Sequence, residues 1–398
     1  MNTTANNKYP KVTLKPSKDR SVRNFHPWLF SGAIKNIKGT VEEGSIVEIY
    51  SNEDEYLAIG HYHEGSIMVR IFSFEQQEID YGFWKAKLAG TYERRRILGY
   101  IDNPETNAYR LVHAEGDDLP GLIIDIYNTT AIIQTHTPGM FAIRHHLAKA
   151  IQEIYGDSIK AVFDKSIHKS AVASETASHY LFGDKGDDLV LENGLKFKID
   201  WEEGQKTGFF IDQRDNRELV GKLSKGKTVL NAFSYSGGFS VYALKGGAKL
   251  VHSVDSSNKA IELADINVKN NFDQANHQSF PEDVFDFLKK MDNVYDLIIL
   301  DPPAFAKHLS SVDKATIGYR NLNFEALRRI KSGGILFTFS CSQVIDKTLF
   351  RKILFLAAAQ AKRKVRVLYQ LSQPSDHPIN LFHPEGEYLK GLVVLVED

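Results

Sequence analysis

The sequence predicts an α/β protein in three parts: a β-rich domain over residues 1–75, a central α+β module over 76–200, and a mostly parallel sheet over 201–398. After Trp201, apolar strand-like runs alternate with stretches of helical apolar spacing, which is typical of a parallel sheet with helices on both faces. The last two predicted strands, RKVRVLYQL and YLKGLVVLV, are joined by a loop without a helix, so we expect them to pair antiparallel.

The composition excludes several classes of protein. The chain has 398 residues, of which 42% are hydrophobic and 25% are charged, as expected for folded globular domains. No apolar run approaches the roughly 20 residues of a membrane span, and the N-terminus lacks the apolar core of a secretion signal, so we expect a cytoplasmic protein without a membrane partner. The single cysteine, Cys341, excludes an internal disulfide and a multi-cysteine zinc site, and we expect no metal.

The β-rich N-terminal part carries a local basic patch, although the whole chain has a net charge of only −1. Between residues 11 and 38 there are seven lysines and arginines but one acid, Asp19, and the cations are interleaved with Phe25, His26, Trp28 and Phe30. Phosphates and unstacked bases are natural partners of such a surface. Alternatively, Trp28 and Phe30 belong to the core and the lysines only solvate edge strands; both interpretations stay open. His61 and His63 are expected to form a surface pair.

The central module begins with a predicted helix over 81–98, followed by strands at YRLVHAE, GLIIDIY and TAIIQTH, a helix over 141–155 and the strand KAVFDK. The first helix ends in Arg94, Arg95 and Arg96. This arginine run either contacts RNA or, as is more common in such helices, forms a solvated face.

The stretch 228–256, TVLNAFSYSGGFSVYALKGGAKLVHSVDS, predicts a cofactor site. It reads as a strand, a small-residue turn, a helix and a second strand that ends at Asp255. Gly237 and Gly238 would let a ligand approach bare backbone at a helix N-terminus, and Asp255 can accept hydrogen bonds from both hydroxyls of a ribose. A nicotinamide dinucleotide and S-adenosylmethionine (SAM) share this feature, but the dinucleotide spacing G-x-G-x-x-G is absent. An ordinary α/β turn is the alternative.

The other polar residues of this part also follow predicted strands, and the carboxyl ends of parallel strands form the ligand-binding edge of such sheets. Asp283 is placed to accept a hydrogen bond from an adenine amino group, or simply caps the helix that follows it. Asp301, at the tip of the apolar strand LIIL, can hold the edge of a planar base, while Pro302 and Pro303 stiffen its backbone. A related D/N-P-P-aromatic element holds amines in amino-directed methyltransferases, but here the aromatic Phe305 comes one position late.

Cys341 comes at the end of the predicted strand GGILFTFSCS, where the polar residues Ser340, Ser342 and Gln343 appear. A lone cysteine in an apolar strand is usually a small core residue. In a methyltransferase, however, a cysteine thiolate that adds to C6 of a pyrimidine makes C5 nucleophilic enough to take a methyl group. We therefore expect Cys341 to be a nucleophile.

Several motifs taken together resemble the bacterial 23S rRNA (cytosine-C5) methyltransferases, and the N-terminal part resembles their PUA RNA-binding domain. The motifs are NAFSYSGGF, DPPAF, Gly318-Tyr319-Arg320, FSCS, DHPINLFHPEGEYLKG, AEGDDLPGL and KTGFFIDQRDNR. The resemblance implies a Rossmann-like class I methyltransferase sheet, SAM as cofactor, 23S rRNA as partner, and Cys341 as nucleophile. It also implies that Phe210, Gln213 and Arg214 help to enclose the cofactor. Members of this family often have a lysine directly after DPP, whereas this chain has Ala304 and, three residues later, Lys307.

The expected catalytic residues are Cys341, Asp301 and Pro302. The expected cofactor-binding residues are Phe210, Gln213, Arg214, Asn231, Ala232, Phe233, Gly237, Gly238, Asp255, Ser256, Asp283 and Asp301. Two alternatives remain: a SAM-dependent enzyme acting on an exocyclic amine or another RNA base, and a non-catalytic RNA-binding protein. The sequence leaves the oligomeric state open and is compatible with a homodimer.

Overall fold

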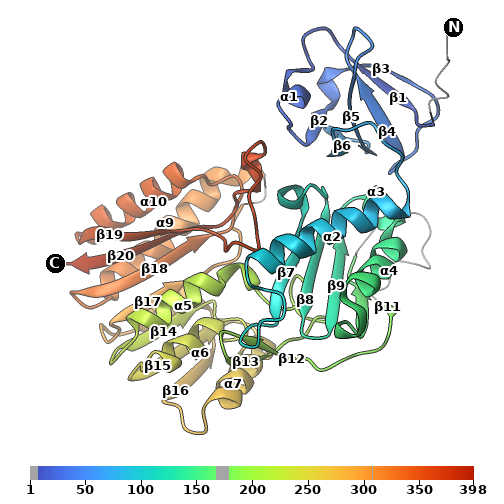
Figure 1. The fold of residues 1–398 in the computed structure, drawn as a ribbon. Coiled ribbons are helices and arrows are strands. Elements are labelled where there is room, and N and C mark those ends of the chain that lie inside the picture. The colour runs from blue at the N-terminus through green and yellow to red at the C-terminus, as the bar shows by residue number, and fades with distance from the viewer. Residues whose placement is uncertain (1–7, 167–178, 307) are drawn as a thin grey trace, which may run out of the picture. The chain divides into compact units, whose positions relative to one another are not determined.

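The computed structural model describes residues 8–166, 179–306 and 308–398 (Figure 1). The chain forms two compact units, each assembled from three segments. The first unit consists of Met1–Asp188, Asp200–Gly208 and Ser375–Gly386, and the second of Leu189–Ile199, Phe209–Pro374 and Glu387–Asp398. The division into three parts at residues 75 and 200 stays a prediction.

The N-terminal part of the first unit is a six-stranded sheet, which confirms the predicted β-rich domain. Its strands lie in the order β2-β6-β5-β4-β1-β3, and β1 and β4 are its one parallel pair among the described residues. Alternating apolar side chains, such as Val12, Leu14 and Val69, fill its core. The elements are β1 (Lys11–Leu14), α1 (Arg20–Arg23), β2 (Trp28–Phe30), β3 (Ile34–Lys38), β4 (Ile46–Tyr50), β5 (Tyr56–Tyr62) and β6 (Ile67–Ser73).

His61 lies on β5 and is buried, with 4% of its surface exposed, so the expectation of a surface pair with His63 is wrong. Its ring stacks on Trp84 at a centroid distance of 5.6 Å and meets Phe72 edge-on at 4.8 Å. Burial lowers the pKa of His61 to about 3. The side chain is therefore a neutral core residue.

The rest of the first unit contains a five-stranded sheet in the order β11-β10-β9-β8-β7, on which α2 and α4 pack together. Asp80 caps α2 by accepting a hydrogen bond of 2.9 Å from the amide of Phe83. Trp84 and Leu88 of α2 enter the same core as Leu147 of α4. The elements are α2 (Tyr81–Ile97), β7 (Ala108–His113), β8 (Leu122–Tyr127), β9 (Thr130–Thr135), α3 (Pro138–Ala142), α4 (Arg144–Tyr155), β10 (Ala161–Asp164) and β11 (His179–Phe182).

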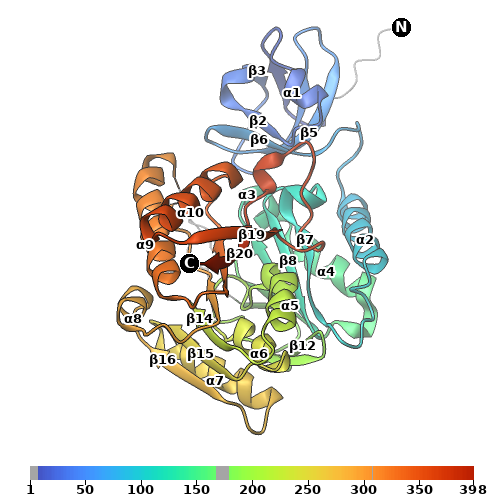
Figure 2. The ribbon, with the colours of Figure 1, turned by 90° about the vertical axis from the view of Figure 1, so that its left-hand side faces the viewer.

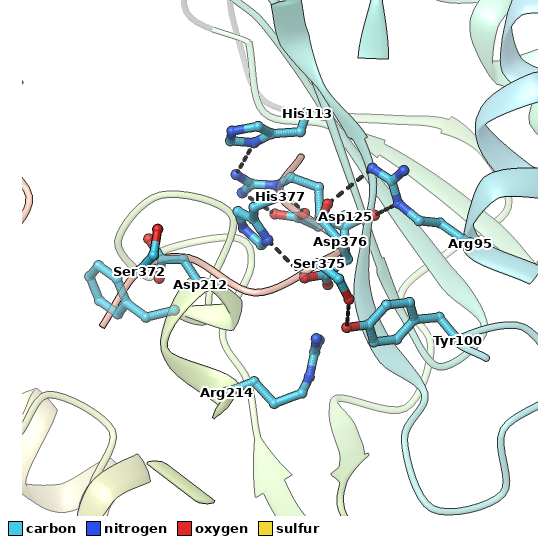
Figure 3. Close-up of polar contacts among 12 residues, drawn as sticks. Arg95, Tyr100, His113, Asp125, Asp212, Arg214, Ser372, Ser375, Asp376 and His377 are labelled. Carbon is cyan, nitrogen blue, oxygen red and sulfur yellow. Dashed lines mark hydrogen bonds and ion pairs between the residues drawn. The ribbon is translucent and has the colours of Figure 1, made fainter. Parts of the chain in front are cut away.

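The segment Ser375–Gly386, which lies between the last two strands in sequence, packs within the first unit. Figure 3 shows Arg95 donating a 3.0 Å hydrogen bond to the carbonyl of Asp376, and the hydroxyls of Tyr100 and Ser375 lying 2.9 Å apart. Arg95 also forms a bidentate pair with Asp117 and is 1% exposed. The expectation that the whole arginine run is a solvated face, or contacts RNA, is therefore wrong for Arg95, because its guanidinium is buried in this network.

The second unit contains the predicted mostly parallel sheet. Its seven strands lie in the order β16-β15-β14-β17-β18-β20-β19, and the first five are parallel. β20 runs antiparallel to both β18 and β19, which confirms the expected pairing of the last two strands. A hairpin of β12 (Leu189–Glu192) and β13 (Leu195–Lys198) precedes the sheet. The strands are β14 (Thr228–Ala232), β15 (Leu250–Asp255), β16 (His277–Pro281), β17 (Leu297–Leu300), β18 (Gly334–Ser340), β19 (Lys364–Leu371) and β20 (Lys390–Glu397).

Helices cover both faces of this sheet because the central strands are apolar on both sides. Val229 and Ile299 pack on one face with residues of α5 and α6, whereas Leu230 and Ile298 pack on the other face with α8, α9 and α10. Helices α9 and α10 lie side by side (Figures 1 and 2). The helices are α5 (Arg214–Leu223), α6 (Gly238–Lys245), α7 (Asn258–Asn271), α8 (Val284–Lys290), α9 (Val312–Arg329) and α10 (Lys347–Ala361).

No helix in the described part of the chain is long and apolar enough to span a membrane. The same residues contain no group of three or more His, Cys, Asp and Glu side chains placed to hold a metal ion.

Candidate active site

The carboxyl ends of the five parallel strands meet at one edge of the sheet in the second unit. In the strand register, Ala232 lies opposite both Val254 and Leu300, and Leu300 lies opposite Thr338. The residues that follow these strand ends therefore emerge together, at the edge where parallel sheets bind ligands. They include Phe233, Ser256, Asp283, Asp301 and Cys341, all of which the sequence had indicated.

The loop between β14 and α6 has an uncommon backbone conformation. Phe233 and Tyr235 have φ values of 60° and 43°, a region that bulky residues rarely occupy and that costs about 1–3 kcal/mol per residue. Hydrogen bonds hold the loop there: the amide of Tyr235 donates to Oδ2 of Asp255 at 3.0 Å, and the amide of Ser234 donates to the carbonyl of Val254 at 3.0 Å. Asp255, the last residue of β15, thus also holds the loop between β14 and α6 in place.

Gly237 and Gly238 are required by packing. Gly237 has a φ of 75°, and a Cβ there would lie 2.8 Å from Cβ of Ala264 in α7. A Cβ on Gly238 would lie 2.9 Å from Cδ of Arg217 in α5. The two glycines therefore let α6 start close to its neighbours, and they also leave its N-terminal amides uncovered by side chains of their own.

Asp255 and Asp283 both have acceptor capacity to spare. Asp255 is half-buried, and its Oδ1 accepts a 3.0 Å hydrogen bond from the amide of Ser257 in addition to the bond from Tyr235. A carboxylate offers about four lone-pair positions, so two remain for ribose hydroxyls. Asp283 is exposed and caps α8, with Oδ1 accepting from the amide of Asp286 at 3.1 Å. The helix-cap interpretation is therefore correct, and it leaves Oδ2 of Asp283 for a ligand.

Asn231 is placed differently from the other expected cofactor residues. Its side chain is fully buried, and Nδ2 donates a 2.9 Å hydrogen bond to Oγ of Ser240 in α6. Ala232 is also fully buried at the end of β14. Asn231 therefore ties the strand to α6, whereas Ala232 packs in the core on the opposite face of the sheet.

A buried carboxylate that the sequence did not single out, Glu192 of β12, anchors the segment before α5. Arg217 donates to both of its oxygens, at 2.8 and 2.6 Å, and uses its remaining nitrogen on the carbonyl of Phe210 at 2.8 Å. Nε of Arg214 lies 3.6 Å from the same carboxylate. The ring of Phe210 meets that of Tyr235 edge-on at 5.1 Å. No local sequence pattern marks Glu192, because its partners lie more than twenty positions away.

Gln213 and Asp301 are brought together by this arrangement. Nε2 of Gln213 donates a 3.0 Å hydrogen bond to Oδ1 of Asp301, and Nδ2 of Asn216 donates to Oε1 of Gln213 at 2.6 Å. Pro302 is buried directly behind Asp301. The carboxylate at the tip of β17 is thus oriented by a side chain from the start of α5.

Cys341 follows β18 and is partly exposed, while Ser340 and Ser342 on either side of it are buried. The hydroxyl of Ser342 lies 3.0 Å from that of Tyr319 in α9 and accepts a 3.4 Å hydrogen bond from the amide of Ala306. The ring of Tyr319 lies 4.6 Å from that of Phe305. The segment 340–342, called the cysteine turn below, is thereby bound to the loop that begins with Asp301-Pro302-Pro303.

A second residue that the sequence did not single out, Lys390, lies behind the cysteine turn. It is 3% exposed, and its Nζ donates hydrogen bonds of 2.7 Å to the carbonyls of Ser342 and Tyr388. Burial lowers the pKa of Lys390 to about 8, and the electrostatic interaction with Cys341 acts against that shift. Lys307, the lysine that follows the DPP element, lies outside the described residues.

In the N-terminal sheet of the first unit, the aromatic residues of the basic patch are largely outside the core. Phe25 and Phe30 are 50% and 46% exposed, so the core interpretation is wrong for Phe30. Trp28 is half-buried and donates a 2.8 Å hydrogen bond from Nε1 to Glu115. The side chains of Lys15, Lys18, Arg20, Arg23, Lys35 and Lys38 are exposed.

Comparisons with known proteins agree with this architecture. Residues 12–74 match a family model described as a PUA-like domain, and residues 164–380 match that of the S-adenosylmethionine-dependent methyltransferases. The chain is 39% identical to ribosomal RNA large subunit methyltransferase I of Alteromonas mediterranea, covering 98% of this chain and 99% of that protein. It is 40% identical to the protein of the same name from Tolumonas auensis, covering 96% and 98%.

Two solved structures resemble the chain along nearly its full length. One, from Streptococcus mutans, is described as a SAM-dependent methyltransferase and has a TM-score of 0.83 at 25% identity, covering 97% of this chain and 99% of that one. The other is a methyltransferase in complex with SAH, with a TM-score of 0.84 at 26% identity and the same coverage. The spare acceptors of Asp255, beside the glycine turn that begins α6, fit the adenosine part of SAM. The chain therefore belongs to the S-adenosylmethionine-dependent methyltransferase family, alongside the proteins named ribosomal RNA large subunit methyltransferase I, and its cofactor is SAM.

Proposed function

We propose that this protein forms 5-methylcytosine in the large-subunit ribosomal RNA, 23S rRNA in bacteria, with Cys341 as its nucleophile. The observation that carries the proposal is the position of Cys341, which is partly exposed and emerges at the same sheet edge as Asp255 and Asp301. The names of relatives that are 39–40% identical over almost the whole chain support large-subunit rRNA as the substrate.

The chemistry explains why a thiol is needed. C5 of cytosine is too weak a nucleophile to take a methyl group unaided, but addition of the Cys341 thiolate to C6 makes C5 enamine-like. SAM supplies the methyl group, and the bond from that carbon to sulfur breaks as the bond to C5 forms. Loss of the C5 proton to a base then restores the double bond as the C6–sulfur bond breaks, which returns the thiolate.

The neighbouring residues take supporting roles in this proposal. Asp301, held by Gln213, accepts hydrogen bonds from the cytosine edge, and Pro302 keeps its backbone rigid. Asp255 binds the ribose of SAM and Asp283 the adenine. The remaining cofactor residues line or support the pocket, and they are Phe210, Gln213, Arg214, Asn231, Ala232, Phe233, Gly237, Gly238 and Ser256.

RNA binding is assigned to the PUA-like part, within the proposed domain 1–75. Lys18 and Arg20 line a shallow depression of about 370 Å³ together with Ser17, Ser21 and Asn24. Exposed cations beside the exposed rings of Phe25 and Phe30 suit a phosphate backbone with unstacked bases.

The test compares the wild type with Cys341→Ala, using labelled SAM, unmodified large-subunit rRNA and mass analysis of the product nucleosides. We expect 5-methylcytosine from the wild type, a loss of methyl transfer by more than about a thousandfold in C341A, and SAM affinity within about twofold of wild type in calorimetry. Unchanged turnover in C341A would refute the nucleophile assignment.

The position of Asp301 supports a second candidate, methylation of an exocyclic amine or of another base. Asp301-Pro302-Pro303 lies at the tip of a buried strand, where a carboxylate can also hold an amine. The same mass analysis separates the two, since ring-carbon and amino methylation give different nucleosides, and the amine reaction would survive in C341A.

A further inference from the structure

Lys390 is a buried lysine directly beside the proposed nucleophile. In the antiparallel pair of β18 and β20, Lys390 lies opposite Ser340, the residue before Cys341. Its side chain is 3% exposed, and lysines are almost never buried to this degree without a specific partner. Its position therefore calls for a function.

The ammonium group of Lys390 binds the backbone of Ser342, the residue that follows Cys341. Nζ donates one 2.7 Å hydrogen bond to the carbonyl of Ser342, the residue after Cys341, and a second of 2.7 Å to the carbonyl of Tyr388. Strand pairing and this hydrogen bond together attach Lys390 to both neighbours of Cys341. The orientation of the cysteine turn thus depends on the lysine.

The two carbonyls satisfy two of the three N–H donors but do not neutralise the charge. The acids that face Lys390 are engaged elsewhere: Glu387 pairs with Lys347, and Asp346 caps α10 by accepting from the amide of Leu349 at 2.7 Å. Lys347 also interacts with Lys390 and opposes its charge, and the buried Tyr319 interacts with Cys341. A thiolate at Cys341 is the charged partner that this ammonium lacks.

We propose that Lys390 is the positioning residue of Cys341, fixing the turn through the carbonyl of Ser342 and stabilising the thiolate with its positive charge. This inference rests on the proposed function of Cys341. When the thiol ionises, its proton passes to water while the ammonium keeps its own. The charge on sulfur disappears in the adduct at C6 and returns when the C6–sulfur bond breaks, so the ammonium favours both the attacking and the departing thiolate.

The chain offers a clean probe of this proposal, because Cys341 is its only cysteine. The rate of alkylation by iodoacetamide is measured from pH 5 to 10 on the full-length protein without RNA. The wild type should show a midpoint below the value of about 8.5 of an ordinary cysteine. Lys390→Met should raise the midpoint by about one pH unit and slow alkylation at pH 7 roughly tenfold, whereas Lys390→Arg, which keeps the charge, should stay closer to the wild type.

Two controls accompany the variants. Lys352→Met removes an exposed lysine of α10 and should leave the alkylation profile almost unchanged. SAM affinity should be unaffected in all three variants, while the kcat of methyl transfer should fall in K390M and recover in part in K390R.

The proposal is overturned if the K390M profile superimposes on that of the wild type. It is equally overturned if the wild-type midpoint lies at or above 8.5, the ordinary value for a free thiol, and that measurement decides the matter even where K390M does not fold. Retained turnover in Cys341→Ala removes the proposed function itself. An inactive C341A together with an unshifted K390M profile removes only the role of Lys390.

Discussion

The side-chain amide of Gln213 donates a 3.0 Å hydrogen bond to Asp301, across the 88 positions that separate them in the chain. Asn216 holds Gln213 in turn, with a 2.6 Å hydrogen bond to its Oε1. A relay of two neutral amides therefore points one oxygen of the Asp301 carboxylate toward α5 and fixes the direction of the other. This relay links the segment before the cofactor loop to the residue proposed to hold the cytosine.

Replacing Asp301 with Asn should lower methyl transfer to rRNA about a hundredfold or more, because an amide offers one acceptor where the carboxylate offers two and loses the charge. The protein should remain folded, since Asn can still accept from Gln213. The measurement is single-turnover methyl transfer at saturating SAM. Asp313→Asn, at an exposed position on α9, is the matched control and should retain full activity. Equal rates for the two variants would contradict the role of Asp301.

Substitutions at Asp283 separate its capping role from its expected contact with adenine. Ser is as good an N-cap as Asp, so Asp283→Ser should keep the stability of α8 but weaken SAM binding about fivefold through loss of the carboxylate. Asp283→Ala should weaken SAM binding and also lower the free energy of unfolding by about 1 kcal/mol. Calorimetry with SAM and denaturant unfolding give the two quantities. Wild-type SAM affinity in D283S would leave Asp283 as a cap alone.

The sheet of the second unit was predictable because the information is local. β14, β17 and β18 are mainly apolar on both faces, and the helices between them have their own periodicity. Asp255 ends β15, Asp301 follows β17, and Cys341 follows β18. Since parallel strands end at one edge, Asp255, Asp301 and Cys341 could be placed together without knowing the tertiary structure.

What the sequence did not reveal depends on contacts between distant residues. Glu192 meets Arg217, and Lys390 meets Ser342, only because of the tertiary fold. His61 and Arg95 look like surface residues by type, but an aromatic cluster and a carboxylate far along the chain bury them. Composition and periodicity do not indicate such partners, because the contacts form only in the folded chain.

Within the arginine run of α2, Arg95 should matter far more for stability than Arg96. Arg95→Met removes one partner of a buried ion pair with Asp117 and two hydrogen bonds to carbonyls, so we expect a loss of about 3–5 kcal/mol in the free energy of unfolding. Arg96→Met removes an exposed pair with Glu93 and should change stability by less than about 0.5 kcal/mol. Urea unfolding of both variants checks this contrast. Similar losses in the two variants would show that the buried network contributes little.

His61 should make the first unit sensitive to acid. Its pKa is lowered from 6.5 to about 3 by burial, so the unfolded chain binds a proton between these values that the folded chain does not. The stability that its neutral form provides is therefore fully present above pH 6.5 and is lost as the pH falls toward 3. We expect the decline of Tm between pH 7 and 4 to be smaller by a few degrees in His61→Phe than in the wild type. His63→Phe, at the partly exposed neighbouring position, should decline like the wild type. Parallel declines in all three proteins would contradict the assignment.

Neutralising cations in the basic patch of the N-terminal sheet should change the affinity for RNA alone. Lys18 and Arg20 are exposed beside a shallow depression, and neutralising them should reduce the number of phosphate contacts by about two. The double variant Lys18→Gln/Arg20→Gln should bind large-subunit rRNA about tenfold more weakly at 0.1 M salt, and the slope of log K against log salt should fall by about 1.5. SAM affinity should not change, because these residues lie in a different unit from the SAM site. Lys362→Gln with Lys364→Gln, two exposed cations of the second unit, is the control for net charge. An unchanged salt slope in the first variant, or an equal change in the control, would mean that RNA does not contact the phosphate site proposed at Lys18 and Arg20.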